Sequence, residues 1–214
     1  MDEMPAFLDR DLGKKEQFKQ TNGLLPSLTT VLVQEMEKFN RMLRVMRNSL
    51  SDLEKAIHGF ISMSEVLDNM YLSLQNGVVP ANWGKVAYPS LKPLASWYID
   101  LKSRVTFMDD WLQNGTPKSY WISGLFFPQG FMTGCLQTHS RMYKIPIDKL
   151  QFSFSVLEAE TIDEVDEAPE DGVYVHGFYL DGARYNRDEG IIDDQIPVSV
   201  ILKSFRPNCT TKCR

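Results

Sequence analysis

The chain has 214 residues, of which 43% are hydrophobic and 24% are charged. This length and composition suit one globular domain, or one domain with a subdomain. The mild net charge of −5 argues against a dedicated nucleic-acid-binding protein, which would carry a basic excess on one face. Eight acids and no Lys or Arg lie between residues 158 and 171, and this acidic run predicts a solvated loop.

The cysteines and the apolar segments indicate a cytosolic or cytoskeletal protein. Cys135, Cys209 and Cys213 form no repeated framework, which is typical of a reducing, intracellular compartment. No apolar run reaches the roughly 20 residues that span a bilayer, and the N-terminal residues lack the apolar core of a signal peptide. We therefore expect no membrane partner. Cys209 and Cys213 lie in a polar tail, where we expect mobile, reactive thiols rather than zinc ligands.

The first part of the sequence predicts two helices after a weakly ordered segment over residues 1–23. Apolar residues recur every three or four positions over residues 28–60, which describes one face of a long helix. A second helix is predicted to begin at Ser62, because Ser62 and Glu65 have the spacing of a capping box. It ends at Asn76-Gly77, where glycine can adopt the left-handed conformation that closes a helix.

Two further helices follow a turn-rich loop over residues 78–89. The third helix opens near Ser90, tolerates Pro93 only within its first turn, and closes at Asn114-Gly115. After an aromatic stretch, a shorter fourth helix is predicted from about residue 129 to residue 143.

Beyond residue 150 the pattern changes from helical to strand-like. Phe152, Phe154 and Val156 alternate with polar residues, as in a strand with one buried face. Residues 172–180 predict a second strand, and residues 198–202 predict a third.

The fold class is therefore α+β, with about four helices followed by a small antiparallel β region that forms an incomplete barrel or sheet. We expect a helical subdomain over residues 24–150 and a β subdomain over residues 151–214 with a divergent or truncated tail.

The sequence encodes no catalytic, cofactor or metal signature. Neither GxxxxGK[ST] nor GxGxxG occurs, so a loop that cradles phosphates is absent from the sequence. Cys135 and His139 lie four residues apart on the fourth helix, but a zinc site needs about four converging ligands. We therefore interpret both as packing residues, and we interpret His176 as a satisfied core or edge histidine of a strand.

Two groups of residues are candidates for an interface. Basic residues share one face of the first helix; this face is either simply solvated or docks onto an acidic partner surface. Aromatic residues cluster before and within the fourth helix; they form either the core between helices and sheet or an apolar interface patch, and both can hold. The candidates are Lys38, Arg41, Arg44 and Arg47 in the basic group, and Trp121, Phe126, Phe127 and Phe131 in the aromatic group.

Several long, ungapped motifs resemble the C-terminal domain of dynein heavy chains. They include YPSLKPL from Tyr88 to Leu94, WISGLFFPQG from Trp121 to Gly130, and IPID from Ile145 to Asp148. GVYVHG over residues 172–177 is similar to a strand of that domain. The resemblance covers roughly residues 26–192, and the aromatic motif is closer to axonemal than to cytoplasmic members.

The resemblance implies a structural and regulatory domain without an active site. In the family this domain follows the sixth AAA+ module, lies across one face of the ATPase ring and modulates motor output. The implied partners are the AAA+ modules of the same heavy chain, with the light and intermediate chains and microtubules reached through the full motor. The implied location is the cytoskeleton and the ciliary axoneme. No cofactor, nucleic acid or membrane partner is implied.

The tail departs from the family pattern after about residue 191. The expected later strands and the apolar ending are replaced by a short polar tail, so we expect unpaired strand edges in the β region. A free-standing adaptor with the same fold, which binds a partner through Phe126-Phe127 or the basic face, is the alternative function. A small enzyme is a third hypothesis. An upstream AAA+ region would distinguish the first two.

Overall fold

The computed structural model describes residues 4–9, 11–12, 26–156, 162–165, 167–169, 172–177, 183–186, 191–194 and 205–211. The protein divides into two compact units, residues 1–115 and residues 116–214. The helical subdomain ending at residue 150 stays a prediction, since this division groups the last long helix with the strands.

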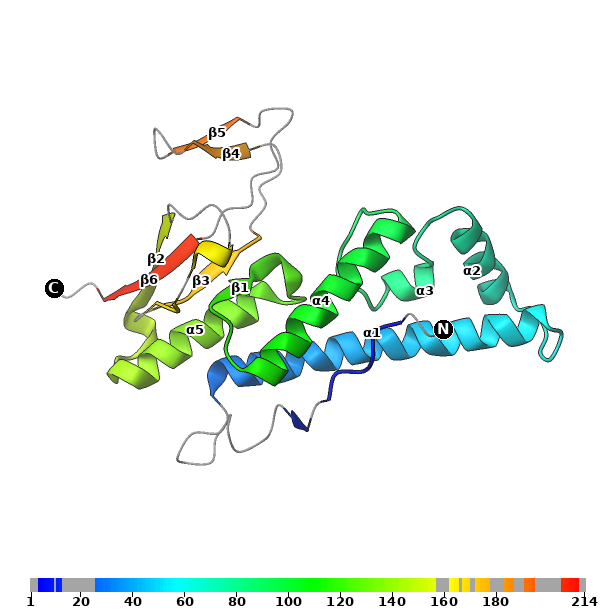
Figure 1. Ribbon diagram of the computed structural model, residues 1–214, viewed down its shortest axis with the longest axis horizontal. Helices are drawn as coiled ribbons and strands as arrows, with labels where there is room; N and C mark the ends of the chain where they lie inside the picture. The colour runs from blue at the N-terminus through cyan, green and yellow to red at the C-terminus, as the bar shows by residue number, and fades with distance from the viewer. Residues whose placement is uncertain are drawn as a thin grey trace. The chain divides into compact units, whose positions relative to one another are not determined.

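The first unit is built on the long helix α1 (Ser27–Ile57), drawn in blue to cyan in Figure 1. Most of its apolar stripe is buried, as the periodicity predicts, but Ile57 at its end is exposed. The helix ends three residues before Phe60, because Gly59 adopts a φ of +75°. The N–H of Phe60 donates to the carbonyl oxygen of Lys55 at 2.9 Å, and the N–H of Gly59 donates to Ala56 at 3.0 Å. This pattern is the Schellman motif that closes a helix.

Helix α2 (Glu65–Gln75) begins later than its predicted capping box. Ser64, rather than Ser62, is the N-cap, and its Oγ accepts a hydrogen bond from the N–H of Leu67 at 3.3 Å. The predicted cap at Ser62 is therefore wrong by two residues. Gly77 follows the helix with a φ of +67°, as the predicted ending requires.

Helix α4 (Leu94–Asn114) follows the one-turn helix α3 (Ala81–Gly84), which lies within the predicted loop. α4 begins immediately after Pro93 rather than near Ser90, so proline stands before the helix instead of within its first turn. The N–H of Leu94 donates to the carbonyl oxygen of Gly77 at 2.8 Å, which fixes the start of α4 beside the end of α2. Gly115, with a φ of +84°, closes the helix as predicted.

A short N-terminal stretch is held on α1 although its polar composition does not predict this. Leu8 is buried, and its backbone N–H and C=O form two hydrogen bonds with the Asn40 side chain at 2.9 and 2.8 Å. Because a side-chain amide has both a donor and an acceptor, Asn40 pairs with the extended backbone as a neighbouring strand would.

The second unit combines one long helix, α5 (Pro128–Tyr143), with short strands (Figure 1). Its other elements are β1 (Ser119–Trp121), η3 (Ile122–Gly124), η4 (Ile147–Lys149), β2 (Leu150–Val156), η5 (Ile162–Glu164), β3 (Tyr174–His176), β4 (Ala183–Asn186), β5 (Ile191–Asp194) and β6 (Phe205–Thr211).

The α+β class is confirmed, but the sheet is mixed rather than purely antiparallel. Its strand order is β1-β3-β6-β2, with β1 parallel to β3 and β6 antiparallel to both β2 and β3; β4 and β5 form a separate antiparallel pair. β1 comes from the aromatic stretch, where no strand was predicted. The predicted strand over residues 198–202 lies outside the described residues. β6 pairs with β2 along residues 150–156, so the tail supplies a partner for one edge that was expected to be open.

Within the described residues, none of the helices is both long and apolar enough to cross a membrane.

Candidate interaction surfaces

Aromatic rings fix the loop that leads into α4. Tyr88 is buried, and its ring stacks on Trp97 with centroids 6.1 Å apart. Trp97 in turn stacks on Trp83 at 6.1 Å, and Phe39 of α1 lies 6.5 Å from Tyr88. Stacked and tilted ring pairs each contribute about 0.5–1.5 kcal/mol beyond the area they bury. We call these four rings, Phe39, Tyr88, Trp97 and Trp83, the aromatic ladder. The ladder connects α1, α3 and α4 to the loop.

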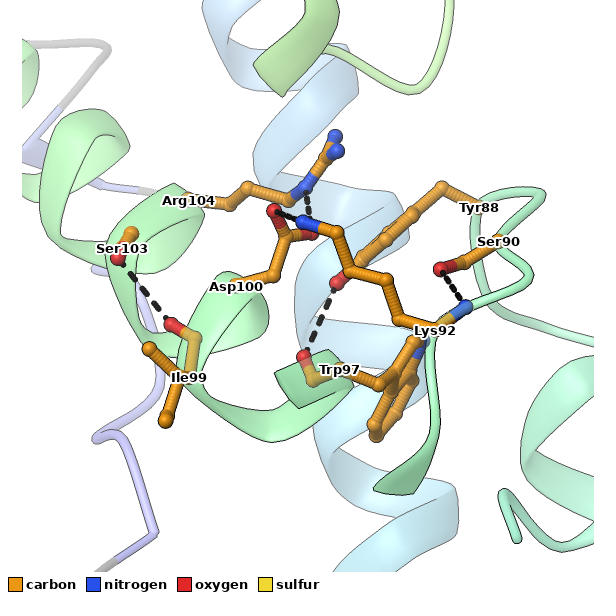
Figure 2. Close-up of polar contacts among 8 residues, drawn as sticks. All are labelled: Tyr88, Ser90, Lys92, Trp97, Ile99, Asp100, Ser103 and Arg104. Atoms are coloured by element: carbon orange, nitrogen blue, oxygen red, sulfur yellow. Dashed lines mark hydrogen bonds and ion pairs between the residues drawn. The ribbon is translucent and has the colours of Figure 1, made fainter. Parts of the chain in front are cut away.

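A charged network lies beside this ladder (Figure 2). Asp100 accepts hydrogen bonds from Lys92 Nζ at 2.6 Å and from Arg104 Nε at 2.7 Å. The Asp100 and Arg104 side chains are 8% and 11% exposed, whereas Lys92 is 51% exposed. The Arg104 guanidinium also lies over the Tyr88 ring, 3.9 Å from its centroid. One carboxylate thus joins the loop residue Lys92 to the helix residue Arg104.

The network keeps Asp100 ionised and Tyr88 protonated. Burial alone would raise the pKa of Asp100, but hydrogen bonds from Lys92 and Arg104 and the guanidinium charge outweigh it and lower that pKa. Burial, followed by the hydrogen bond and charge of Asp100, raises the pKa of the Tyr88 phenol. A carboxylate held by two cations is a poor proton acceptor, so we interpret the network as a positioning device for the loop.

The loop presents an exposed leucine. Leu91 is 104% exposed, while Tyr88 and Lys92 on either side of it are anchored. The Ser90 Oγ accepts a hydrogen bond from the N–H of Lys92 at 3.2 Å. Leu91 borders a hollow of about 730 Å³, which Val78 also lines.

The four basic candidates on α1 do not form one free face. Arg41 and Arg44 are exposed. Arg47 donates to the carbonyl oxygen of Pro5 at 2.6 Å, and its guanidinium lies 4.2 Å from the centroid of the Phe7 ring. Lys38 Nζ lies 3.5 Å from the buried Glu35 carboxylate. Arg41, Arg44 and Lys38, whose side chain is 43% exposed, therefore remain accessible to an acidic partner, whereas Arg47 is tied to the N-terminal stretch.

The aromatic candidates divide between core and surface. Phe131 is fully buried, with its ring centroid 4.8 Å from that of Tyr120. Trp121 and Phe126 are half-buried, and Phe127 is exposed. Phe131 thus belongs to the core of the second unit, and Phe127 is the member of the set most available to a partner.

Glycines hold two of these rings closely. A Cβ at Gly177, or at Gly124, would collide with the Trp121 ring. A Cβ at Gly130 would lie 2.5 Å from the Phe127 ring. The Trp121 ring is therefore packed within the second unit, which argues for a structural role.

A serine and a histidine bridge β1 and β3. Ser119 Oγ lies 2.9 Å from His176 Nδ1, and Ser119 is buried. Burial lowers the pKa of His176 to about 4, so the imidazole is neutral at physiological pH. This hydrogen bond supports the interpretation of His176 as a satisfied histidine. Across the described part of the protein, no group of three or more His, Cys, Asp or Glu side chains is placed to hold a metal ion.

The structure describes both residues of the predicted packing pair but only one of the two tail cysteines. Cys135 and His139 are both buried in α5, and the His139 ring lies 4.4 Å from that of Tyr143. Cys209 lies in β6, in register with Phe152. Cys213 lies outside the described residues, and the expectation that the tail thiols do not bind zinc stays a prediction.

Among the described residues of the first unit, the largest group of exposed apolar side chains close in sequence lies at the connection between α1 and α2, and sequence reasoning missed it. We call residues 57–66 the α1–α2 corner. The periodicity assigned Ile57 and Phe60 to the buried stripe of α1, but Gly59 ends the helix and leaves both exposed. The exposed apolar members are Ile57, Phe60, Ile61, Met63 and Val66.

Comparison with known proteins identifies the family. The family model for the C-terminal domain of the dynein heavy chain matches residues 1–204. This protein belongs to that family. The match confirms the resemblance seen in the sequence motifs and extends it beyond residues 26–192 at both ends.

The curated relatives of this dynein C-terminal domain are axonemal heavy chains. Human dynein axonemal heavy chain 6 is 48% identical over 91% of the sequence, and mouse dynein axonemal heavy chain 12 is 50% identical over 80% of it. Mouse dynein axonemal heavy chain 1 is 49% identical over 75%. The 214-residue chain spans only 4–5% of the length of these relatives. The preference for axonemal members is thus confirmed.

The structure explains one motif of the dynein C-terminal domain in physical terms. The run from Tyr88 to Leu94 is the anchored loop: its tyrosine enters the aromatic ladder and its lysine binds Asp100. Asp100 and Arg104 lie outside the motif, on α4, and sequence reasoning missed both. Their spacing of four residues on a helix was the available signal.

Proposed function

We propose that this protein is the non-catalytic C-terminal structural and regulatory domain of an axonemal dynein heavy chain. It packs on one face of the AAA+ motor ring and modulates microtubule-based motility. The observation that carries the proposal is the family match over residues 1–204. In the curated relatives, the matched stretch is only 5% or less of the full length of the heavy chain. Such a domain acts within a much larger motor.

The internal chemistry of the first unit supports a structural role. Its buried ions neutralise one another and its rings stack into a ladder, so these groups stabilise the shape of the domain. The partners in this proposal are the AAA+ modules of the same heavy chain, with light and intermediate chains and microtubules bound by the full motor. The place of action is the ciliary axoneme.

The test compares a dynein heavy chain that includes this domain with the same heavy chain lacking it. We expect both to hydrolyse ATP, and we expect the gliding velocity and microtubule-stimulated ATPase rate to differ between them. Identical motor output from both proteins would contradict a regulatory role.

A second measurement tests the absence of an active site in the domain. Calorimetric titration of the 214-residue chain with Mg-ATP is expected to give no binding heat, because the sequence encodes no phosphate-binding loop. A saturable micromolar isotherm would show a nucleotide site of a kind that the motifs do not reveal.

The free-standing adaptor remains the alternative, since exposed apolar surface would serve it equally. Sequencing the full transcript separates the two functions. AAA+ modules encoded upstream of residue 1 support the motor domain, and a transcript that encodes none supports the adaptor.

A further inference from the structure

We propose that the α1–α2 corner, residues 57–66, is the point at which this domain docks onto the AAA+ ring, and that its receptor is an apolar surface rimmed by Lys and Arg. The inference rests on the proposed function and specifies the surface and the chemistry of the contact.

The corner exposes large apolar side chains close together. Phe60 is 78% exposed, Val66 is 63% exposed and Ile57 is 57% exposed. Ile61 and Met63 lie between them and are also exposed. Single exposed apolar residues are normal, but a contiguous group within ten residues marks an interaction site.

Hydrogen bonds fix both helix ends that flank the corner. The Schellman hydrogen bonds close α1 below Phe60, and the Ser64 cap opens α2. In many Schellman motifs the residue in the position of Phe60 packs back onto its own helix, whereas here its ring is directed to the surface. Because the backbone of Phe60 is tied to the end of α1, its ordering on binding costs less entropy, which favours affinity.

The charges around the corner define the partner. Residues 52–68 contain four acids, Asp52, Glu54, Glu65 and Asp68, all exposed, and a single base, Lys55. Lys55 Nζ lies 3.7 Å from Asp52, so it partly neutralises one of the four. An acidic rim favours a receptor with basic groups. It disfavours a second copy of the same corner, and it disfavours an anionic lipid surface.

A groove that shares Ile57 with the corner can receive apolar side chains of the partner. Its volume is about 740 Å³, and it lies among α1, α2 and α4 with Ile57, Leu53, Leu74 and Tyr98 in its lining. Ile57 belongs to both the groove and the corner, so the two adjoin at an apolar side chain. Corner and groove together allow interdigitation with an apolar receptor.

The first experiment measures the accessibility of the corner in the assembled motor. Met63→Cys is labelled with a maleimide in a dynein heavy chain that includes this domain, and in the 214-residue chain. Peptide-resolved mass spectrometry separates this label from those on native cysteines. We expect labelling in the heavy chain to be slower by about tenfold or more, which corresponds to a docked fraction above about 90%.

Three control reporters distinguish the faces of the domain. Ile99→Cys is the matched control, because Ile99 is 66% exposed on the solvent face of α4. Arg44→Cys reports on the basic face, and Phe127→Cys reports on the second unit. We expect the Ile99→Cys rate to change by less than about twofold between the two proteins.

The second experiment tests the energetics of docking. Phe60→Asp combined with Met63→Asp is expected to release the domain from the ring and restore rapid labelling of a Val66→Cys reporter. Ile99→Asp is the matched control and leaves labelling slow. Because all four substituted residues are exposed, we expect these changes to leave the fold of the domain intact, and circular dichroism of the 214-residue protein verifies this.

Each outcome decides the inference. If another reporter is protected in the heavy chain while Met63→Cys stays reactive, the domain docks by a different face. The inference would then be wrong, and the proposed function would stand. Equal reactivity of all four reporters in both proteins would contradict ring packing itself. Concentration-dependent protection of Met63→Cys in the 214-residue chain would identify a second copy as the occupant, which also overturns the inference.

Discussion

The two units of this domain reach their structures by different means. In the first, the long helices are amphipathic in their own sequence, and the charged network joins residues close in sequence, Asp100 with Arg104 and Lys92. In the second, β1 pairs with β3 across 55 residues, and β6 comes from the tail to pair with β2. Local periodicity is therefore sufficient to predict the long helices of the first unit, and insufficient to predict the strand pairing of the second.

The largest expected difference between the regions is in hydrogen exchange. Residues 28–143 should exchange at least about a hundredfold more slowly than residues 150–214, because helical hydrogen bonds are local and the β region is assembled from short strands. Mass-spectrometric exchange of the 214-residue protein at low concentration measures this. Uniform strong protection would show that β6 closes the β region as firmly as the helices pack.

The next largest effect concerns the charged network of the first unit. Asp100→Ala should lower the free energy of unfolding by about 3 kcal/mol, because it leaves the nearly buried Arg104 without its carboxylate. Urea denaturation followed by circular dichroism measures the loss. Lys92→Ala is the matched control: its side chain is half exposed, and we expect a loss below about 1 kcal/mol. Equal losses would show that the loop anchor, rather than the buried pair, stabilises the unit.

A glycine substitution tests the packing of the second unit. Gly177→Ala should lower the free energy of unfolding by about 2 kcal/mol, because the new Cβ meets Trp121 and the φ is +71°. Gly115→Ala is the control, with a φ of +84° and open space around the Cβ position. Gly115→Ala should lower the free energy of unfolding only by the cost of the left-handed φ, about 1 kcal/mol. Equal losses in thermal unfolding would mean that Trp121 moves aside freely.

The smallest effect is a pH dependence of the second unit. Since the pKa of His176 falls from 6.5 to about 4 on folding, the unfolded polypeptide binds the proton more tightly between these values. The contribution of His176 to stability is therefore complete above pH 6.5 and decreases as the pH falls toward 4. His176→Gln should remove this dependence while leaving that of the carboxylates. An unchanged pH profile in the variant would assign the acid sensitivity to other groups.

The sequence predicted the helices well and the exposure of individual side chains less well, for one physical reason. The apolar period and the cap glycines act within a few residues, so the bounds of α1, α4 and α5 were predicted to within about four residues. The exposure of Phe60 was not predicted, because three- and four-residue spacing continues past Gly59 although the helix stops there. The sequence predicted that Arg47 shares a basic face with three other residues. In the structure its guanidinium contacts Pro5 and Phe7, which makes it less available to a partner.

The sequence by itself determined the α+β class, the four long helices and membership of the dynein C-terminal domain family, because local periodicity and ungapped motifs carry that information. Only the tertiary structure decided the parallel pairing of β1 with β3, the burial of Asp100 beside Tyr88 and the exposure of the α1–α2 corner. Each of these depends on which distant groups come together to remove a side chain or a backbone edge from water, and a pattern within a few residues does not record that.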